Sequence, residues 1–214
     1  MNFSTKIISW YQQNYRNLPW RNTNDAYKIW LSEIILQQTR VSQGLPYYIN
    51  FITAFPTVND LANADEQQVL KLWQGLGYYS RARNLHFTAK FVVENLNGIF
   101  PTTYEELLKL KGIGTYTAAA IASFSANEAV AVVDGNVFRV LSRIFNVNYD
   151  ISLNTTKKYF IELAQKLLST TQPNLHNQAI MEFGALQCVP KSPNCEKCVL
   201  NSGCLALQKN KVNQ

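Results

Sequence analysis

Apolar residues recur three or four positions apart along almost the whole chain, and this helical spacing limits the fold more than any other feature of the sequence. Pro, Gly, Asn and Asp interrupt the pattern and divide it into about ten segments. We therefore predict an all-α fold. The run 129–133 is rich in β-branched residues but has no second strand to pair with, so we predict an extended loop there. The predicted helices are Ser4–Tyr15, Tyr27–Gln38, Ser42–Ala54, Asp65–Leu76, Ser80–Leu96, Thr103–Leu110, Thr115–Ser125, Asn136–Phe145, Leu153–Leu168 and His176–Leu186, with Thr57 and Asp65 as N-caps.

The charge balance favours a polyanionic partner. The chain has 20 Lys and Arg against 14 Asp and Glu, a formal net charge of +6, and nucleic acid is the first polyanion to consider. A solvated basic surface without a partner would have the same composition. The segment 1–11 lacks an apolar signal core, and no stretch approaches the roughly 20 apolar residues that span a bilayer, so we expect a cytoplasmic, nucleoid-associated protein without membrane contact.

All four cysteines lie within the last 27 residues, separated by six, two and five residues: Cys188, Cys195, Cys198 and Cys204. A disulfide framework would usually distribute its cysteines to close longer loops. The clustering predicts a metal centre instead. By chemistry alone, zinc and a [4Fe-4S] cluster are both admissible, because four thiolates serve each of them.

A glycine-containing turn separates two amphipathic segments at 110–115. Gly112 and Gly114 permit a tight turn with outward-pointing N–H groups next to the start of a helix, where one DNA phosphate can bind without base recognition. Lys111 is a candidate phosphate partner. The alternative is an ordinary helical corner with a glycine C-cap.

Two carboxylates stand in distinctive surroundings. Glu33 has Ile29, Trp30 and Leu36 as helical neighbours, and burial on this apolar face would raise its pKa, as a general acid requires near neutral pH. The alternative is a structurally paired glutamate. Asp134 precedes the helix that begins near Asn136 and is suited to capping it.

Several of these motifs resemble one family of DNA repair enzymes. The stretch 110–122, followed by Asp134, resembles the helix-hairpin-helix of base-excision glycosylases with its catalytic aspartate. The string 30–39, Trp-Leu-Ser-Glu-Ile-Ile-Leu-Gln-Gln-Thr, is similar to that of adenine DNA glycosylases, and the cysteine spacing resembles that of endonuclease III and adenine glycosylases. The resemblance extends from about residue 7 to residue 207.

The resemblance implies a two-domain organisation. It places a six-helix barrel with the hairpin at 24–130, and an iron-sulfur domain made of 1–23 together with 131–214. It also implies a [4Fe-4S] cluster on the four cysteines and an active site in the cleft between the domains. Full-length relatives usually continue into a domain that recognises 8-oxoguanine, which this sequence lacks, so we expect a weaker preference for adenine opposite 8-oxoguanine over adenine opposite guanine.

The family chemistry assigns roles to the carboxylates. Cleavage of an N-glycosidic bond needs a proton on the leaving purine and negative charge beside an oxocarbenium-like sugar. By resemblance, Glu33 would protonate adenine and Asp134 would stabilise the cation, with help from Asn136. Tyr116 stands where bifunctional relatives carry a Schiff-base lysine, and a phenol cannot form an imine, so we expect a monofunctional enzyme.

Further positions are expected to contact DNA. The resemblance places the stretches with Gln37, Gln38 and Thr39 and with Leu76 and Tyr78 at the minor groove, where Tyr78 would stack near the lesion. The stretch 75–83 mixes aromatic residues, glycines and cations as a DNA-contacting loop would.

Six further residues have expected positions or roles. Arg16 and Gln178 match family positions near the base pocket. We expect Arg139 and Arg143 to contact the DNA backbone or to form surface ion pairs, and His86 and His176 to have surface or capping roles.

The substrate implied is double-stranded DNA with adenine opposite 8-oxoguanine or guanine, bound by a monomer. Three alternatives stay open: a mismatch thymine glycosylase of the same fold, a bifunctional lyase, and a noncatalytic sensor of DNA damage. The glutamine pair favours adenine over thymine, and Tyr116 disfavours the lyase.

Overall fold

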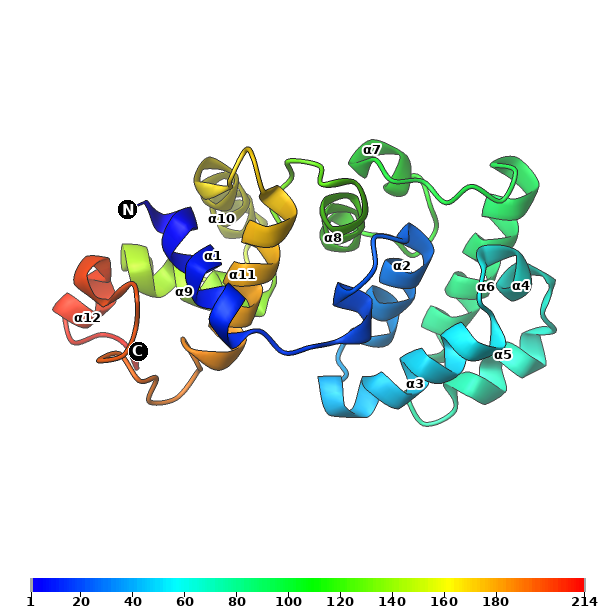
Figure 1. Ribbon diagram of the computed structural model, residues 1–214, viewed down its shortest axis with the longest axis horizontal. Helices are drawn as coiled ribbons and strands as arrows, with labels where there is room; N and C mark the ends of the chain where they lie inside the picture. Colours follow the sequence, from blue (N-terminus) through cyan, green and yellow to red (C-terminus); the bar gives the residue numbers. More distant parts are fainter. Residues whose placement is uncertain (1, 214) are drawn as a thin grey trace. The chain divides into compact units, whose positions relative to one another are not determined.

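The computed structural model describes residues 2–213, and within them every regular element is a helix (Figure 1). The all-α prediction is therefore confirmed. The chain divides into two compact units: a terminal unit, Met1–Arg16 with Ala129–Gln214, and a central unit, Asn17–Glu128. The two chain ends thus belong to the same unit.

The central unit is built around large buried aromatic side chains. Helix α2 packs on α3 and α8, and α6 packs on α4 and α5 (Figure 1). Trp30, Phe51 and Trp73 are fully buried; the rings of Trp30 and Phe100 are tilted, with centroids 4.8 Å apart, and Phe51 lies edge-on to Trp73 at 5.8 Å. Its elements are η1 (Pro19–Arg21), α2 (Ala26–Ile35), α3 (Val41–Ala54), α4 (Val58–Asn63), α5 (Glu66–Trp73), α6 (Tyr79–Asn95), α7 (Tyr104–Leu107) and α8 (Thr115–Ala126).

The terminal unit has its own hydrophobic core. Helix α11 packs on α1 and on α9, which also contacts α12, and Ile7, Phe160 and Phe183 are completely enclosed between them. The first helix of the chain is thereby fixed to a helix more than 150 residues later, which explains how the unit forms from two separated segments. Its elements are α1 (Phe3–Asn14), α9 (Gly135–Phe145), α10 (Asn154–Leu167), α11 (Pro173–Leu186), η2 (Asn201–Gly203) and α12 (Leu205–Gln208).

The predicted helix starts are correct where a capping side chain is present. Thr57 and Asp60 form a reciprocal capping box, and Asp65 accepts from the N–H of Gln67 at 3.0 Å, so both predicted N-caps are confirmed. The short helices α4 and α12 were not predicted, because four to six residues hold too few turns for a periodic pattern. The predicted end of α2 at Gln38 is wrong: the helix ends at Ile35, and Gln38 has a φ of +56°.

The segment 129–133 is an extended loop, as predicted. Two side-chain amides replace the missing strand partner. Gln165 accepts from the N–H of Ala131 and donates to the carbonyl of Ala129, while Asn177 accepts from Val132 and donates to Val130. Side-chain amides therefore bond to the backbone N–H and carbonyl groups of residues 129–132, which lead to Asp134, as a neighbouring strand would in a sheet.

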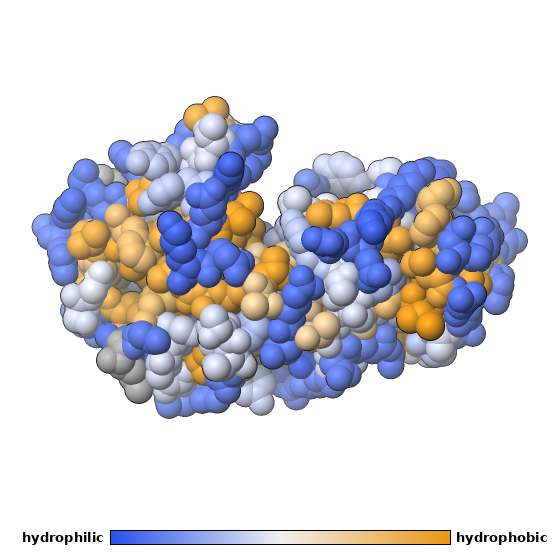
Figure 2. Space-filling view, turned by 90° about the horizontal axis from the view of Figure 1, so that it is seen from above, coloured by the Kyte–Doolittle hydropathy of each residue, from blue (hydrophilic) through white to orange (hydrophobic). Residues whose placement is uncertain are grey.

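Hydrophilic side chains cover much of each unit on the face drawn in Figure 2, with smaller apolar areas between them. Within residues 2–213 we find no helix whose length and apolar character would let it cross a membrane. The expected surface roles of the histidines are wrong, since His86 and His176 are both 2% exposed. His176 contacts the hydroxyl of Ser4 at 2.8 Å, and burial lowers its pKa to about 4.

Candidate active site

Asp134 caps helix α9 from a half-buried position. Its Oδ1 accepts from the N–H of Val137 at 2.8 Å, and its Oδ2 accepts from the side-chain amide of Asn136 at 2.8 Å. Burial raises the pKa of this carboxyl, and the two hydrogen bonds and the charge of Arg139 oppose that rise. The capping role predicted for Asp134 is confirmed, and the carboxylate is held in one orientation.

A line of hydrogen bonds leads from Asp134 to the first cysteine. Asn136 donates to Asp134 and accepts from Arg139 Nη2 at 2.8 Å, and Arg139 Nε donates to the carbonyl of Cys188 at 2.8 Å. Close packing fixes Asn136 further, because a Cβ at Gly184 would lie 2.6 Å from its Cβ. The orientation of the carboxylate is therefore coupled to the backbone of the cysteine segment.

Glu33 lies in the last turns of α2, on a helix whose other faces are almost entirely buried. Its own side chain is half-buried. Asp25 caps the start of this helix by accepting from the N–H groups of Tyr27 and Lys28, and Ser32 bonds back to Ile29. The position of Glu33 is thus set by a helix that is anchored through its apolar neighbours.

The hairpin joins α7 to α8 and rests on α6. Gly112 has a φ of +79°, the left-handed region, and a Cβ there would lie 3.1 Å from Asn84 Cβ. Thr88 donates to the carbonyl of Lys111 at 2.7 Å, and Lys111 Nζ lies 4.4 Å from the ring centre of Phe87.

The start of α8 is open. Gly114 is its N-cap, no side chain among the described residues caps it, and a Cβ at Gly114 would meet nothing within 4 Å. Backbone N–H groups of an uncapped first turn, next to open space, have the chemistry of an anion site. Tyr116 is the second residue of this helix and is half-buried.

Two loops of the central unit have unusual backbone geometry. Gln38 and Tyr78 both adopt left-handed conformations, with φ of +56° and +46°, although neither is glycine. Gln38 is exposed, and the ring of Tyr78 is 68% exposed. Gln37 and Thr39 are half-buried beside Gln38, and Leu76 is buried. Both strained residues therefore present their side chains to solvent.

Arg16 and Gln178 both bond inside the terminal unit. Arg16 forms a two-pronged ion pair with Glu182, whose side chain is completely buried, and the backbone N–H of Arg16 bonds to the same carboxylate. Gln178 accepts from the hydroxyl of Tyr11 at 2.8 Å. Glu182 was missed in the sequence because the helix around it carries no partner at i±3 or i±4 that would mark it.

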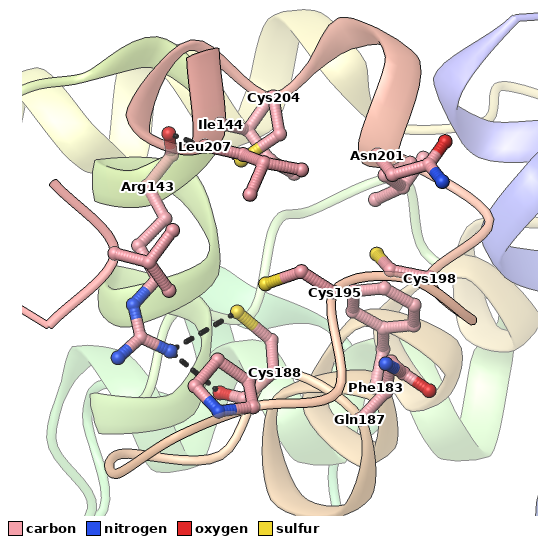
Figure 3. A pocket seen from close by; sticks show the side chains of 13 residues that line it. Arg143, Ile144, Phe183, Gln187, Cys188, Cys195, Cys198, Asn201, Cys204 and Leu207 are labelled. Atoms are coloured by element: carbon pink, nitrogen blue, oxygen red, sulfur yellow. Dashed lines mark hydrogen bonds between the residues drawn. The ribbon is translucent and has the colours of Figure 1, made fainter. Parts of the chain in front are cut away.

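The four cysteines line one small, largely apolar cavity (Figure 3). All four are free thiols, and Phe183, Leu200 and Leu207 enclose the space with them. Burial raises the pKa of Cys198 to about 11 and also raises that of Cys195, so a cation is needed to keep these groups as thiolates.

Within the described part of the chain, no three His, Cys, Asp or Glu side chains converge as the ligands of a single metal ion would. The thiolates of a [4Fe-4S] cluster each bind a different iron and so lie farther apart than ligands of one zinc ion. Four cysteines around a common cavity are a donor set that fits a cluster whose irons each take one thiolate.

Arg139 and Arg143 hold the cysteine segment, and the surface roles expected for them are wrong. Arg143 is 8% exposed and donates to the carbonyls of Val189 at 2.7 Å and Pro190 at 2.8 Å. It also donates to the Sγ of Cys188 at 3.4 Å, as Figure 3 shows. Arg139 donates to the carbonyls of Cys188 and Gly184. Their guanidinium groups replace the secondary structure that this irregular segment lacks.

The predicted site residues belong to different units. The central unit holds Glu33, the hairpin, Tyr116 and the two strained loops, and the terminal unit holds Asp134, Asn136, Arg16, Gln178 and the cysteines. Within the terminal unit the structure joins Asp134, Asn136 and the segment of Cys188 through hydrogen bonds.

Comparison with known proteins is consistent across sequence and structure. Residues 31–169 match the model of the HhH-GPD superfamily of base excision DNA repair proteins. An adenine DNA glycosylase of Buchnera aphidicola (subsp. Baizongia pistaciae) is 42% identical over 99% of this chain and 60% of its own length. The human adenine DNA glycosylase is 44% identical over 97% of this chain and 40% of its own length. The chain thus spans about half the length of these curated relatives.

Two solved structures have the same fold. A thermostable thymine-DNA glycosylase superposes with a TM-score of 0.89 at 30% identity, covering 97% of this chain and 95% of that one. Endonuclease III in a non-covalent DNA complex superposes with a TM-score of 0.79 at 19% identity, covering 97% and 94%. The helix-hairpin-helix glycosylase fold predicted from the sequence is confirmed.

Proposed function

Because the chain belongs to the HhH-GPD superfamily of base excision DNA repair proteins, we propose that it is a DNA glycosylase that removes adenine mispaired with 8-oxoguanine or guanine. The observation that carries this proposal is the identity of 42–44% to adenine DNA glycosylases over 97–99% of the chain. The second candidate is thymine excision from mismatches, favoured by the 30% identity to a thymine-DNA glycosylase of nearly equal length. Identity is lower to the thymine enzyme, so adenine is the preferred substrate.

In the proposed reaction, the N-glycosidic bond breaks and its electron pair goes to the leaving base. Glu33 donates a proton to adenine, so that the base departs neutral, and the Asp134 carboxylate stabilises the positive charge that develops on the sugar. Water then adds to C1′ and gives its proton to the Glu33 carboxylate, which restores the acid. The products are free adenine and an abasic site in an intact strand.

The surroundings of Asp134 act on its charge in both directions. Burial raises the pKa of its carboxyl, while the N–H of Val137, the amide of Asn136 and the nearby Arg139 favour the charged form and limit that rise. These groups also fix its direction, so the enzyme would not need to reorganise dipoles when the sugar cation forms.

Tyr116 supports hydrolysis without strand cleavage. A Schiff-base lyase needs an amine at the sugar, and the second residue of α8 is a phenol. Lys111, the nearest cation in the hairpin sequence, lies over the Phe87 ring and serves better as a phosphate partner than as a nucleophile.

The proposed cofactor is a [4Fe-4S] cluster held by Cys188, Cys195, Cys198 and Cys204. Its chemistry would be structural: a cationic core that keeps four thiolates deprotonated and closes an irregular segment. Arg143 and Arg139 already fix the backbone around Cys188, and the line of hydrogen bonds through Asn136 would carry that order to Asp134.

For the DNA interface, we assign the open first turn of α8 to one phosphate and the exposed Gln38 and Tyr78 to the space left by an extruded base. Lys111, Gly112 and Gly114 would form the phosphate site. Gln37, Thr39 and Leu76 would support the two minor-groove loops.

The test is single-turnover cleavage of duplexes with adenine opposite 8-oxoguanine, adenine opposite guanine, or thymine opposite guanine, each with and without alkali. We expect alkali-dependent cleavage at adenine only. The variant Glu33→Gln should lower the rate by roughly 10²–10⁴-fold, the usual contribution of a general acid. The control Glu162→Gln, at a carboxylate that is 57% exposed, should leave it unchanged. Cleavage at thymine, or strand breakage without alkali, would contradict the proposal.

A further inference from the structure

Arg81 turns inward, although it lies in a stretch whose composition is typical of DNA contacts. It occupies the first turn of α6, and its guanidinium is partly buried between the two strained loops. Nη1 donates to the carbonyl of Ile34 at 3.0 Å and to that of Gln37 at 2.6 Å, while Nη2 donates to the carbonyl of Leu76 at 3.3 Å.

These carbonyls explain why an arginine is needed at this position. Ile34 is one of the last four residues of α2, whose carbonyls have no partner within the helix, and Leu76 follows the end of α5. A cation at helix C-termini is favoured by the helix dipoles. The planar fork of a guanidinium can reach two loops at once, which a single ammonium cannot.

Aromatic rings complete the site around the guanidinium. Its central carbon lies 5.1 Å from the ring centre of Trp73 and 5.7 Å from that of Tyr78. No carboxylate in residues 2–213 forms an ion pair with Arg81, so its charge is balanced by carbonyl dipoles and rings. Such a contact has a cost in desolvation, and burial lowers the pKa of this guanidinium.

The Tyr78 loop has further restraints, but they do not reach the Gln38 loop. Tyr47 donates to the carbonyl of Gln74 at 2.8 Å, and Trp73 Nε1 donates to the carbonyl of Gly77 at 2.9 Å. Within residues 2–213, the hydrogen bonds and the ring contact of Arg81 join residues 34–37 to residues 76–78.

We propose that Arg81 is a positioning residue that locks the Gln38 loop and the Tyr78 loop at one separation, so that both side chains can enter the DNA stack together when a base is extruded. This inference rests on the proposed function, because the two loops act on DNA only if the protein extrudes a base. Without Arg81, each loop can relax from its left-handed backbone independently.

The first test needs no DNA. Amide hydrogen exchange of the intact protein is compared for wild type, Arg81→Met and Arg83→Met. Arg83 lies two residues away in the same helix in an exposed ion pair with Glu66, so its substitution removes the same charge without touching either loop. For Arg81→Met we expect exchange in both 36–39 and 75–79 to be about tenfold faster than in wild type, or more. For Arg83→Met we expect the wild-type exchange rates. Unchanged exchange in either loop would overturn the proposal.

The second test measures base extrusion by the fluorescence of 2-aminopurine placed at the adenine position of a duplex. Arg81→Met should slow extrusion at least about tenfold in the wild-type background but less than about threefold in a Tyr78→Ala background, because contacting residues are non-additive. Equal slowing in both backgrounds would mean that Arg81 does not act through Tyr78, which overturns the proposal.

Arg81→Lys separates positioning from attraction to phosphate, and it carries the test if Arg81→Met does not fold. It keeps the charge but not the fork, so we expect the slow extrusion to remain; full recovery would overturn the proposal. If Arg81→Met has faster loop exchange but the wild-type protein does not release adenine, the role of Arg81 in the loops stands and the proposed substrate is refuted. Unchanged exchange in an active adenine glycosylase would refute only the role of Arg81.

Discussion

Replacement of Arg16 by Met should destabilise the terminal unit strongly, because it removes two charged hydrogen bonds from a buried carboxylate. Glu182 is completely buried and receives two bonds from the guanidinium of Arg16 and one from its backbone N–H. The substitution removes the first two and keeps the third. The completely buried Glu182 carboxylate thereby loses its pairing with the Arg16 guanidinium.

The magnitude follows from the geometry. Removal of one partner from a buried ion pair costs about 3–5 kcal/mol. Arg16 is 39% exposed and its backbone N–H remains, so water and one donor reduce the loss to about 2–3 kcal/mol in the free energy of unfolding. For a chain of this length, such a loss corresponds to a decrease in Tm of roughly 4–12 °C.

The assay is thermal unfolding followed by circular dichroism, with the visible absorbance of every sample matched so that cofactor content is equal. Arg16→Met is compared with Glu182→Gln and with the double variant. The double variant should be more stable than Arg16→Met alone, because no unpaired charge is then buried. A change below 1 °C in Arg16→Met, or a double variant less stable than both single ones, would refute this reasoning.

The remaining predictions concern single positions. Because burial raises the pKa of Asp134, its carboxyl favours folding while it is protonated and loses that contribution as the pH rises through the raised pKa. Asp134→Asn should therefore increase Tm at pH 7.5, and this gain should vanish in acid. The same variant should abolish base release. Wild-type single-turnover rates should fall as the pH drops through the same pKa. The pKa of His176 is lowered from 6.5 to about 4, so its neutral form stabilises the fold. Tm of the wild type should therefore decrease as the pH falls from 6.5 to 4, and it should decrease less in His176→Gln. Cys198→Ser should reduce iron content measured by plasma spectrometry and lower Tm, whereas equal iron would count against the proposed cluster. Gly112→Ala should cost about 1 kcal/mol or more in stability and weaken duplex binding measured by anisotropy, because the left-handed turn and the contact with Asn84 oppose a side chain.

The parts of the fold that could be predicted are those determined by local interactions. Helical spacing identified most helices, and the caps Thr57 and Asp65 lie where their side chains bond to the next turn. The end of α2 could not be predicted. The carbonyls of Ile34 and Gln37 at this end bond to Arg81, which is 44 residues from Gln37 in sequence, and no local pattern marks such a contact.

The same limit applies to the candidate site. The capping geometry of Asp134 follows from its own neighbours, so the sequence was sufficient to predict it. The inward-turned Arg81 and Arg143 look like surface cations in the sequence, because the carbonyls that bind them belong to distant irregular segments. Every residue has a backbone carbonyl, so the sequence does not mark which carbonyls accept hydrogen bonds from an arginine. Such contacts can be recognised only once the path of the backbone is known.

Two irregular segments near Asp134 are held in place by polar side chains. Side-chain amides of Gln165 and Asn177 hold the segment before it, and Arg139 and Arg143 hold the cysteine segment. Both segments avoid regular secondary structure and satisfy their backbone through long polar side chains. Loss of Arg139 should therefore disturb the carboxylate through Asn136 as well as the cysteine segment.

The most direct test of the central claim identifies the released base. A duplex with adenine opposite 8-oxoguanine is incubated with excess protein, and the free bases are separated and identified by mass spectrometry. The account predicts free adenine in a one-to-one ratio to abasic sites from wild type, with an uncut strand before alkali, and loss of at least about a hundredfold in rate for Glu33→Gln. Two results would contradict the account: release of thymine from an otherwise identical duplex with thymine opposite guanine but no release of adenine, or no release of any free base by correctly folded protein.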